Sequence, residues 1–468
     1  MASGILGIAL TGLNAAQAGL RTTQHNIANV NTAGYRRQET ILATARPQST
    51  LAGSFGNGAD VDTVRSLYSR FLDNQLLQGQ SQLAHHTFYS AAAGQIDQLL
   101  GDADSGLATA LDRYFNAIHE LADDPGSGAA RQLVLSAGNS LAGRINILDA
   151  QLRSAIATGN GELDQMVGQA NLRAGQIARL NAEIARVEAA QAGQPANDLR
   201  DLRQKLIGEL NEVVNVSLVQ QGDGPASVFI GNGQPLVLGD RAYSLGTAVD
   251  PGNSMLRVPT IDLGGTPMRL QAAQITGGRM GGLLAYREDV LLPAFDDLND
   301  IAAAIASEVN GVHGGGLDYN LNPGTDFFTD PASVPAGDYA RSMRMLLSSA
   351  DRVAAAGAGA TGPGDNANAL ALAALRFKPV LASGTASFGE AYGQTIARTA
   401  SHAAQADVNL SAFTSLVRSA EADSRAVSGV NLDEEAVNLI RFQQAYQASA
   451  KAMQIAAGLF DEVLAVVR

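Results

Sequence analysis

Both ends of this 468-residue chain carry a heptad pattern, and that pattern is the feature that most constrains the fold. From residue 432 to residue 468 the sequence indicates one continuous helix, whose apolar or small residues alternate in steps of three and four. Residues 3–30 repeat this alternation. Such steps produce a coiled-coil seam, which a single helix cannot bury by itself. The sequence therefore predicts that the two termini pair as a coiled coil, with everything else between them.

The residues of the two seams are apolar or small, with a few aromatic rings among them. In the C-terminal helix they are Leu439, Phe442, Tyr446, Ser449, Met453, Ala456, Phe460, Val463 and Val467. In the N-terminal helix they are Leu6, Ala9, Leu13, Ala16, Leu20, Thr23, Ile27 and Val30. We expect the aromatic residues in a packed core, which here means either a subunit interface or the groove of a partner protein, because an amphipathic helix serves both.

Glycines weaken the N-terminal helix. Gly4, Gly7, Gly12 and Gly19 each cost about 1 kcal/mol relative to alanine in a helix interior. An isolated copy of this helix is therefore marginal and orders only on packing. We expect residues 1 to about 32 and about 432–468 to be disordered or loosely docked in the monomer, and to fold on assembly.

The composition excludes several classes of protein. The net charge is −13 and there is no dense run of lysine and arginine, so the sequence predicts no nucleic-acid partner. There is no cysteine, which excludes disulfides, thiolate zinc sites and cysteine nucleophiles. No apolar stretch reaches the ~18 residues of a membrane span, so no membrane insertion is expected. The N-terminus lacks a basic segment before its apolar residues, which makes it a poor secretory signal.

Between the termini the apolar period changes from helical to alternating and back. This predicts a mainly α chain with an inserted small β subdomain, an α+β class with elongated, discontinuous domains. The predicted divisions are a terminal coiled-coil core domain at 1–35 and 432–468, a helical rod-like domain at 36–213, 276–313 and 388–431, the β subdomain at 214–275, and a reduced, loop-rich outer insertion at 314–387.

Glycine, proline and capping residues predict local irregularities within these divisions. They are a break near Gly159 to Gly161 in a helix over 128–190, a cap at Asn197 or Asp198, a kink or break at Pro293 in a helix over about 280–312, and a strand at 342–347.

A polar motif follows the first helix, from Asn26 to Gln38. Asn26, Asn29 and Asn31 stand near the helix end. Their side chains either terminate the helix by bonding to backbone groups or serve packing and assembly. Gly34 suits a left-handed turn that reverses the chain.

Three acids, Asp433, Glu434 and Glu435, lie in the predicted first turn of the last helix. Acidic side chains there interact favourably with the helix dipole. We therefore expect simple capping rather than a ligand role for them.

The polar motif resembles the N-terminal signature shared by the rod, hook and hook-associated proteins of the bacterial flagellum, which form the flagellar axial protein family. The ending from Gly34 to Gln38 is similar to that of the hook-associated members. Residues 428–435, 441–446, 278–287 and 326–328 resemble the same members, so the likeness touches both ends and the middle. The N-terminal assembly motif that it implies comprises Asn26, Ile27, Ala28, Asn29, Asn31, Gly34, Tyr35, Arg37 and Gln38.

The chain departs from the family pattern in three places. His25 stands where asparagine is common, and Arg36 stands where a small polar residue is common. The region 314–388 is short for the family, which implies that an outer domain is reduced here.

The resemblance implies a structural protein at the hook–filament junction of the bacterial flagellum. It implies an extracellular location, reached unfolded through the flagellar type III export system without a cleaved signal peptide. The implied partners are copies of itself in a ring or short helical layer, hook protein below, and a second junction protein and the filament above. The C-terminal helix is also implied to bind a cytoplasmic export chaperone, through the seam residues Leu439, Phe442, Tyr446, Met453, Phe460, Val463 and Val467.

No pattern in the sequence indicates an enzyme. The histidines, including the adjacent pair His85 and His86, form no His-Glu-x-x-His zinc motif, and residues 277–282 lack the Gly-Lys-Ser/Thr of a phosphate loop. No Gly-x-Ser-x-Gly elbow is present. We expect no catalytic residue, no cofactor and no metal. Two alternatives stay open: another axial subunit, hook or distal rod, and, less favoured, a secreted enzyme on a coiled-coil stalk.

Overall fold

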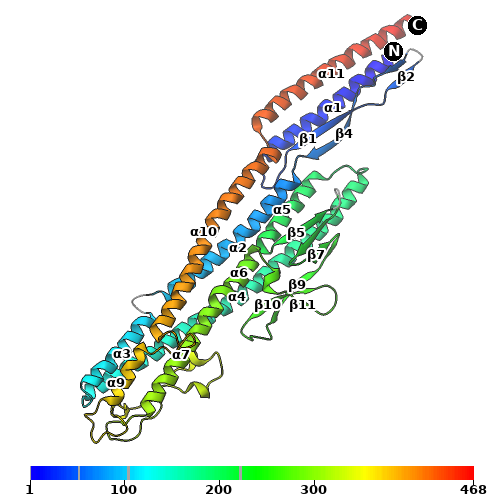
Figure 1. The fold of residues 1–468 in the computed structure, drawn as a ribbon. Helices are drawn as coiled ribbons and strands as arrows, with labels where there is room; N and C mark the ends of the chain where they lie inside the picture. Colours follow the sequence, from blue (N-terminus) through cyan, green and yellow to red (C-terminus); the bar gives the residue numbers. More distant parts are fainter. Residues whose placement is uncertain (1, 51–52, 103–105, 221–223, 468) are drawn as a thin grey trace.

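The computed structural model describes residues 2–50, 53–102, 106–220 and 224–467, and shows an elongated, mainly helical molecule (Figure 1). Both termini lie at one end of it, where α1 (Ala2–Asn29) and α11 (Leu432–Val467) run side by side. The prediction of a mainly α fold with paired terminal helices is therefore confirmed. Among the described residues, no helix combines the length and the apolar character that a membrane span requires.

A β-hairpin supports the terminal helices. Strand β1 (Gln38–Thr44) pairs antiparallel with β4 (Ala59–Ser66), and the shorter strands β2 (Gln48–Thr50) and β3 (Gly53–Phe55) form a second pair. Figure 1 shows α1 between this hairpin and α11. The end of the molecule therefore consists of three layers, with α1 in the middle.

The body of the molecule is a rod of long helices. Helices α2 (Arg70–Leu100) and α10 (Phe388–Ser428) run together along it (Figure 1). Beside them lie α3 (Leu107–Asp123), α4 (Gly128–Ala190) and α5 (Asn197–Val213). Buried apolar side chains of these helices form one continuous core.

Helix α4 is unbroken over 63 residues, so the predicted break near Gly159 is wrong. A Cβ atom at Gly159 would lie 3.3 Å from Leu283 Cδ1, which indicates that the glycine permits a close approach of a neighbouring helix. The adjacent Asn160 bonds to the β subdomain, donating to Met255 O and accepting from Arg257 N. The two residues serve tertiary contacts rather than a turn.

The β subdomain consists of two antiparallel sheets that pack against α4. The first sheet has the order β5 (Val216–Gln220), β6 (Ala226–Ile230), β7 (Gln234–Leu238), β8 (Arg241–Ala242), and the second has the order β11 (Met268–Arg269), β10 (Arg257–Asp262), β9 (Ser244–Val249). Two asparagines of α4 attach them: Asn171 bonds to the backbone of Leu245, and Asn181 bonds to that of Ala226.

After the 3-10 turn η1 (Ala272–Gln274), helix α6 (Gly278–Tyr286) continues through a π-helical turn, η2 (Arg287–Leu291), into α7 (Leu292–Gly314). The helix is not broken at Pro293; its hydrogen bonding changes in the π turn instead, and Pro293 lies in the first turn of α7 directly after it. Proline lacks the N–H that a helix interior requires, so it is tolerated at this first turn. The buried side chain of Arg287 connects the π turn to β10 by donating to Arg257 O.

The end of the rod far from the termini is made of short elements and loops. They are η3 (Pro331–Ser333), α8 (Tyr339–Ser342), η4 (Ala350–Arg352), α9 (Ala367–Ala374) and η5 (Leu375–Phe377). The strand expected at 342–347 is wrong: in the described residues this segment makes one isolated bridge, Phe328 to Met345. Asn146 of α4 donates to Met343 O, so a helix side chain takes up a backbone group that a sheet would have paired.

Candidate functional site

The chain passes from the terminal helix pair to the rod at the polar motif, and we call residues 25–38 together with their contacts on α2, α5 and α11 the joint. Helix α1 ends at Asn29, and the chain reverses through Gly34, whose φ is +84°. Glycine adopts that positive φ without strain. The turn returns residues 35–38 to the side of α1.

Asn26 is the centre of the joint and is 1% exposed. Its Oδ1 accepts from Tyr35 Oη (2.7 Å) and Gln38 N (2.9 Å). Its Nδ2 donates to Gln38 O (2.9 Å) and to Glu435 Oε2 (3.1 Å). The side chain thus pairs with both backbone groups of Gln38 and reaches α11, so Asn26 packs the joint together rather than simply terminating the helix.

Arg37 bonds to the end of α10 and to the start of α11. Its Nε donates to Glu435 Oε1 (2.8 Å), its NH1 donates to Glu434 Oε2 (2.7 Å), and its backbone N donates to Ser428 O (2.9 Å). Glu435 is 1% exposed, and its buried charge is balanced by Arg37. The expectation of simple capping misses this pairing, and the Asn431 side chain accepts the cap hydrogen bond from Asp433 N.

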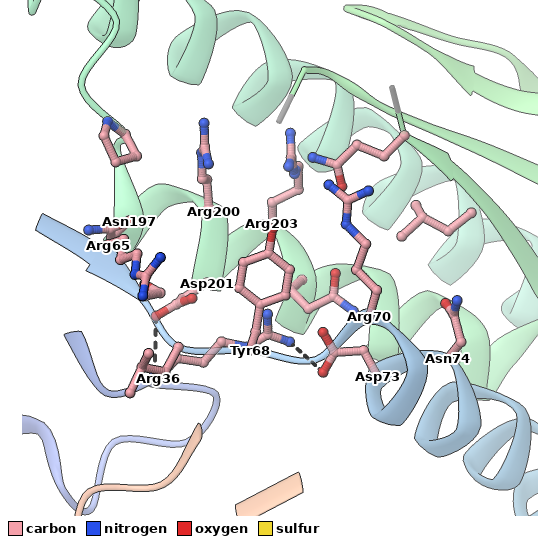
Figure 2. A pocket seen from close by; sticks show the side chains of 16 residues that line it. Arg36, Arg65, Tyr68, Arg70, Asp73, Asn74, Asn197, Arg200, Asp201 and Arg203 are labelled. Carbon is pink, nitrogen blue, oxygen red and sulfur yellow. Dashed lines mark hydrogen bonds and ion pairs between the residues drawn. The ribbon is translucent and has the colours of Figure 1, made fainter. Parts of the chain in front are cut away.

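Arg36 connects the joint to the rod. Its guanidinium pairs with Asp73 of α2 (2.9 Å) and lies over the Tyr68 ring. Its backbone N donates to Asp201 Oδ2 on α5 (3.1 Å), as Figure 2 shows. Burial raises the pKa of the Asp201 carboxyl to about 7, while Arg36 opposes that rise. Burial also raises the pKa of Asp73, again against Arg36.

Asp198 forms a third connection. Its Oδ1 accepts from Gln38 Nε2 (2.8 Å) and lies 3.2 Å from His25 Nε2. The expected cap at Asn197 or Asp198 is wrong, because Ala196 is the N-cap residue and no side-chain cap bond is made there. The two departures from the family pattern, His25 and Arg36, therefore both contact acids of the rod.

The remaining residues of the motif form no hydrogen bond with α11 in the described structure. Asn29 bonds locally, donating to His25 O and accepting from Thr32 Oγ1, which is the behaviour of a helix terminator. Asn31 and Ala28 are exposed, and Ile27 is half-buried. The residues that the structure does bring together are Asn26, Tyr35, Arg37 and Gln38, with Gly34 as the turn.

The two terminal helices meet in a constant antiparallel register. Gly12 faces Ser449, Gly19 faces Phe442, and Asn26 bonds to Glu435. Each step is seven residues on both helices, which is one heptad. On the predicted seams, the buried residues are Ala9, Ala16, Thr23 and Ala456.

The predicted C-terminal seam is only partly covered in one chain. Leu439, Phe442 and Met453 are half-buried, whereas Tyr446 is 38% exposed and Phe460 is 45% exposed. The side chains of Val463 and Val467 lie outside the described part of the structure. A second apolar stripe of α11, which the seam pattern did not reveal, is also exposed: Val437, Ile440, Ile455 and Leu459.

Two hollows flank Arg36. The first, of about 630 Å³, lies between the end of β4, the start of α2 and α5, and is the hollow drawn in Figure 2. The second, of about 890 Å³, lies between residues 30–37, α5 and the end of α10. Across the described ranges of the chain, no three or more histidine, aspartate or glutamate side chains gather as a metal site would require. The joint therefore holds the terminal pair to the rod by polar contacts with open space on both sides.

Comparisons with known proteins identify this arrangement. Residues 426–466 match the C-terminal model of the flagellar basal body rod FlgEFG proteins, which indicates the class of flagellar axial proteins. Residues 93–328, half of the chain, match the helical domain of flagellar hook-associated protein FlgK. The chain belongs to this FlgK family, of which curated relatives are named flagellar hook-associated protein 1.

The similarity extends over the whole chain. Flagellar hook-associated protein 1 of Escherichia coli K12 is 29% identical over 544 aligned positions, covering 99% of each chain. That of Bacillus subtilis 168 is 28% identical over 502 positions, covering 99% of this chain and 98% of the relative. The solved structure of the flagellar hook junction protein FlgK from Burkholderia pseudomallei has a TM-score of 0.70 at 19% identity. It covers 76% of this chain and 100% of that one, which shows the shared fold.

Proposed function

We propose that this chain is a structural adaptor of the flagellum that forms the junction zone between hook and filament. The observation that carries the proposal is the membership in the FlgK family, together with a joint that fixes the terminal pair to the rod. Such a protein acts mechanically. It transmits the position of the inner helices to the outer rod, and no catalytic step is part of the proposal.

The proposed partners follow from the uncovered stripes on α11. Copies of this chain, in a ring or short helical layer, cover Val437, Ile440 and Ile455 when their terminal helices pack together, because such apolar stripes are unfavourable in water. Hook protein is the partner below, and a second junction protein and the filament are the partners above. Before assembly, an export chaperone binds the same helix.

The predicted assembly residues and domain divisions belong to this proposal. The N-terminal assembly motif acts through the joint, since its residues Asn26 and Arg37 set the position of α11. The C-terminal seam acts through the side chains that one partner helix leaves uncovered, among them Tyr446 and Phe460.

The proposed location is the outside of the cell, after export in an unfolded state through the flagellar type III system without a cleaved signal peptide. The reduced outer insertion at 314–387 is part of the proposal. Its position is taken from the sequence pattern; the alignment with the E. coli relative spans 544 positions against the 468 residues of this chain, which makes this chain the shorter of the two.

A seeding assay tests the function. Purified protein is added to isolated hooks of the source organism, followed by the other junction component and flagellin, and the ends are imaged by electron microscopy. A short layer on the hook end that is required for filament growth supports the proposal. Long tubes formed by the protein alone would instead assign it to the hook-type subunits, and failure to bind hook ends would contradict the proposal.

A further inference from the structure

A third hollow lies near the end of the rod far from the termini, in the groove between α3 and α4 (Figure 1). It has a volume of about 660 Å³ and is lined mostly by small or apolar residues, among them Ala110, Ala117 and Ala137. Leu133 and Ile147 border the groove, and they are 43% and 50% exposed. Apolar side chains exposed along a groove between two helices are typical of a surface that a third helix covers.

Two arginines of this groove have no acidic partner. Arg113 and Arg144 line it, and neither forms an ion pair in the described part of the chain, where Glu120 is the one acid of the lining. The Nε of Arg144 is buried without a hydrogen-bond partner among the described residues, and this guanidinium interacts with the uncharged phenol of Tyr392. A buried donor without an acceptor is unfavourable. An occupant that brings carboxylate oxygens would therefore be stabilised in the groove.

Helix α7 carries the opposite charge, also without a partner. Asp296 and Asp300 are exposed, and neither forms a hydrogen bond or an ion pair among the described residues. Burial, followed by the effect of neighbouring acids, raises the pKa of both carboxyls, and like charges four residues apart destabilise a helix. The same side of α7 continues with the small residues Ala303, Ser307 and Gly311. We call these five residues the acidic face.

The groove and the acidic face lie at the same level of the rod. Asn146 Nδ2 donates to Ala340 O, and Asn299 Oδ1 accepts from Ala340 N, so the neighbouring Arg144 of α4 and Asp300 of α7 are at similar heights. Arg144 and Asn146 are two residues apart, which is about 200° around an α-helix. The groove and α7 therefore lie on different sides of α4.

We propose that the α3–α4 groove of one copy of this chain binds the acidic face of a neighbouring copy. The proposal rests on the proposed function, in which copies pack beside one another. Charge complementarity selects this occupant, since unpaired guanidiniums of the groove meet unpaired carboxylates of α7. A contact between two different surfaces is heterologous, and contacts of that kind build a ring or a helical layer.

Cysteine cross-linking tests the contact, because the chain contains no cysteine of its own. Ser140→Cys places a thiol in the groove, and Ser307→Cys places one on the acidic face; both serines are exposed. A mixture of the two variants is assembled on isolated hook ends and treated with a short bismaleimide. We expect a cross-linked dimer from the mixture and several-fold less from either variant alone, because the two surfaces differ.

The matched control pairs Ser140→Cys with Ser254→Cys, an exposed serine outside both surfaces. No dimer from the mixture of Ser140→Cys and Ser307→Cys, or as much dimer from the control pair, would overturn the contact. If the native protein leaves no layer on hook ends, the proposed function fails. The same mixtures are then cross-linked in concentrated solution, where the dimer would support the contact between copies and its absence would overturn that contact as well.

Charge exchange tests the role of the unpaired groups. Arg113 and Asp300 are exposed, so their substitution retains the fold. Arg113→Glu in the Ser140→Cys chain, or Asp300→Arg in the Ser307→Cys chain, is expected to lower the dimer yield several-fold, and both together should restore most of it. Arg269→Glu, at an exposed arginine outside both surfaces, should leave the yield unchanged. Failure of the exchanged pair to recover the yield would overturn the pairing of these charges.

Discussion

The ring of Phe442 lies directly over Gly19, so that a Cβ atom built on the glycine would be 2.5 Å from Phe442 Cε1. The glycine that weakens the N-terminal helix therefore has a structural role. Gly19 lowers the helix propensity of α1, and at the same time it lets α11 approach closely enough for an aromatic ring to pack across the helix backbone.

Substitution of this glycine is expected to separate the helices. Gly19→Ala should destabilise the terminal pair by about 1–3 kcal/mol, the usual cost of overpacking, although alanine favours a helix. Hydrogen exchange of the α1 and α11 amides measures the effect. The control is Gly7→Ala, where the nearest atom is 3.9 Å away and the helix should be stabilised. Equal results for the two variants would contradict the close contact at Gly19.

From the contacts of the joint we predict that substitutions of two neighbouring acids of α11 have unequal effects on stability. Glu435 is buried against Arg37 and Asn26, so Glu435→Ala should cost about 3–5 kcal/mol, as removal of one member of a buried pair does, or should undock the terminal pair outright. The side chain of Glu434 is 56% exposed, so Glu434→Ala should cost less than about 1 kcal/mol. Hydrogen exchange of the α1 amides measures both, and a similar change for the two variants would contradict the buried pairing.

The loose docking of the terminal segments in the monomer stays a prediction. The half-buried Phe442 and the exposed Tyr446 and Phe460 support it, because one partner helix covers only part of the seam. In a dilute monomer, the amides of α1 and α11 are expected to exchange much faster than those of α4, and fastest at the ends away from the joint. Strong protection of both terminal segments would count decisively against this prediction.

The sequence predicts the helices and their pairing because these depend on local periodicity, as in the seam from Ala9 to Thr23. The joint depends on contacts between residues far apart in the chain. Arg37 and Glu435 are separated by 398 positions, and acids at the start of a helix look like ordinary dipole partners. The signal that could have revealed the pairing is the heptad register itself, which places Glu435 opposite Asn26 once Phe442 is placed opposite Gly19.

The wrong expectations have a common physical cause. Gly159 in α4 and Asp198 in α5 are residues whose local preference is a break or a cap, but tertiary contacts decide their roles. Gly159 admits a neighbouring side chain, and Asp198 accepts from Gln38. Propensity gives a weak preference that such contacts override.

Because the pKa of Asp201 is raised in the folded chain, we predict that the protein loses stability as the pH rises. Its pKa is about 7 in the folded chain against 3.8 ordinarily, so the folded state holds a proton that the unfolded state releases. This contribution is complete below pH 3.8 and is lost as the pH rises from there through 7. Between about pH 5.5 and about pH 8.5 the native protein should lose about 2 kcal/mol relative to Asp201→Asn, whose amide oxygen can still accept from Arg36 N. Urea unfolding at both pH values measures this difference, and parallel pH profiles would refute the prediction.

For His85, in the middle of the rod, we predict that stability depends on pH in the opposite direction. Its Nδ1 is buried without a hydrogen-bond partner among the described residues, Gly281 packs closely against that Nδ1, and Gly282 packs against the His85 backbone. Burial, with a smaller effect of the neighbouring His86, lowers the pKa of His85 to about 4 from 6.5. The unfolded state then binds the proton more tightly, so this contribution to stability is complete above pH 6.5 and falls as the pH drops toward 4.

The variant His85→Leu isolates this effect, because leucine keeps an apolar side chain in the same place and cannot titrate. Between about pH 7.5 and about pH 5 the native protein should lose about 2 kcal/mol more than the variant, measured by urea unfolding. Equal losses of stability in the native protein and in His85→Leu between these two pH values would show that His85 is not the titrating group. A variant that loses more stability than the native protein would show that the imidazole is stabilised when charged, which the buried Nδ1 and the close glycines argue against.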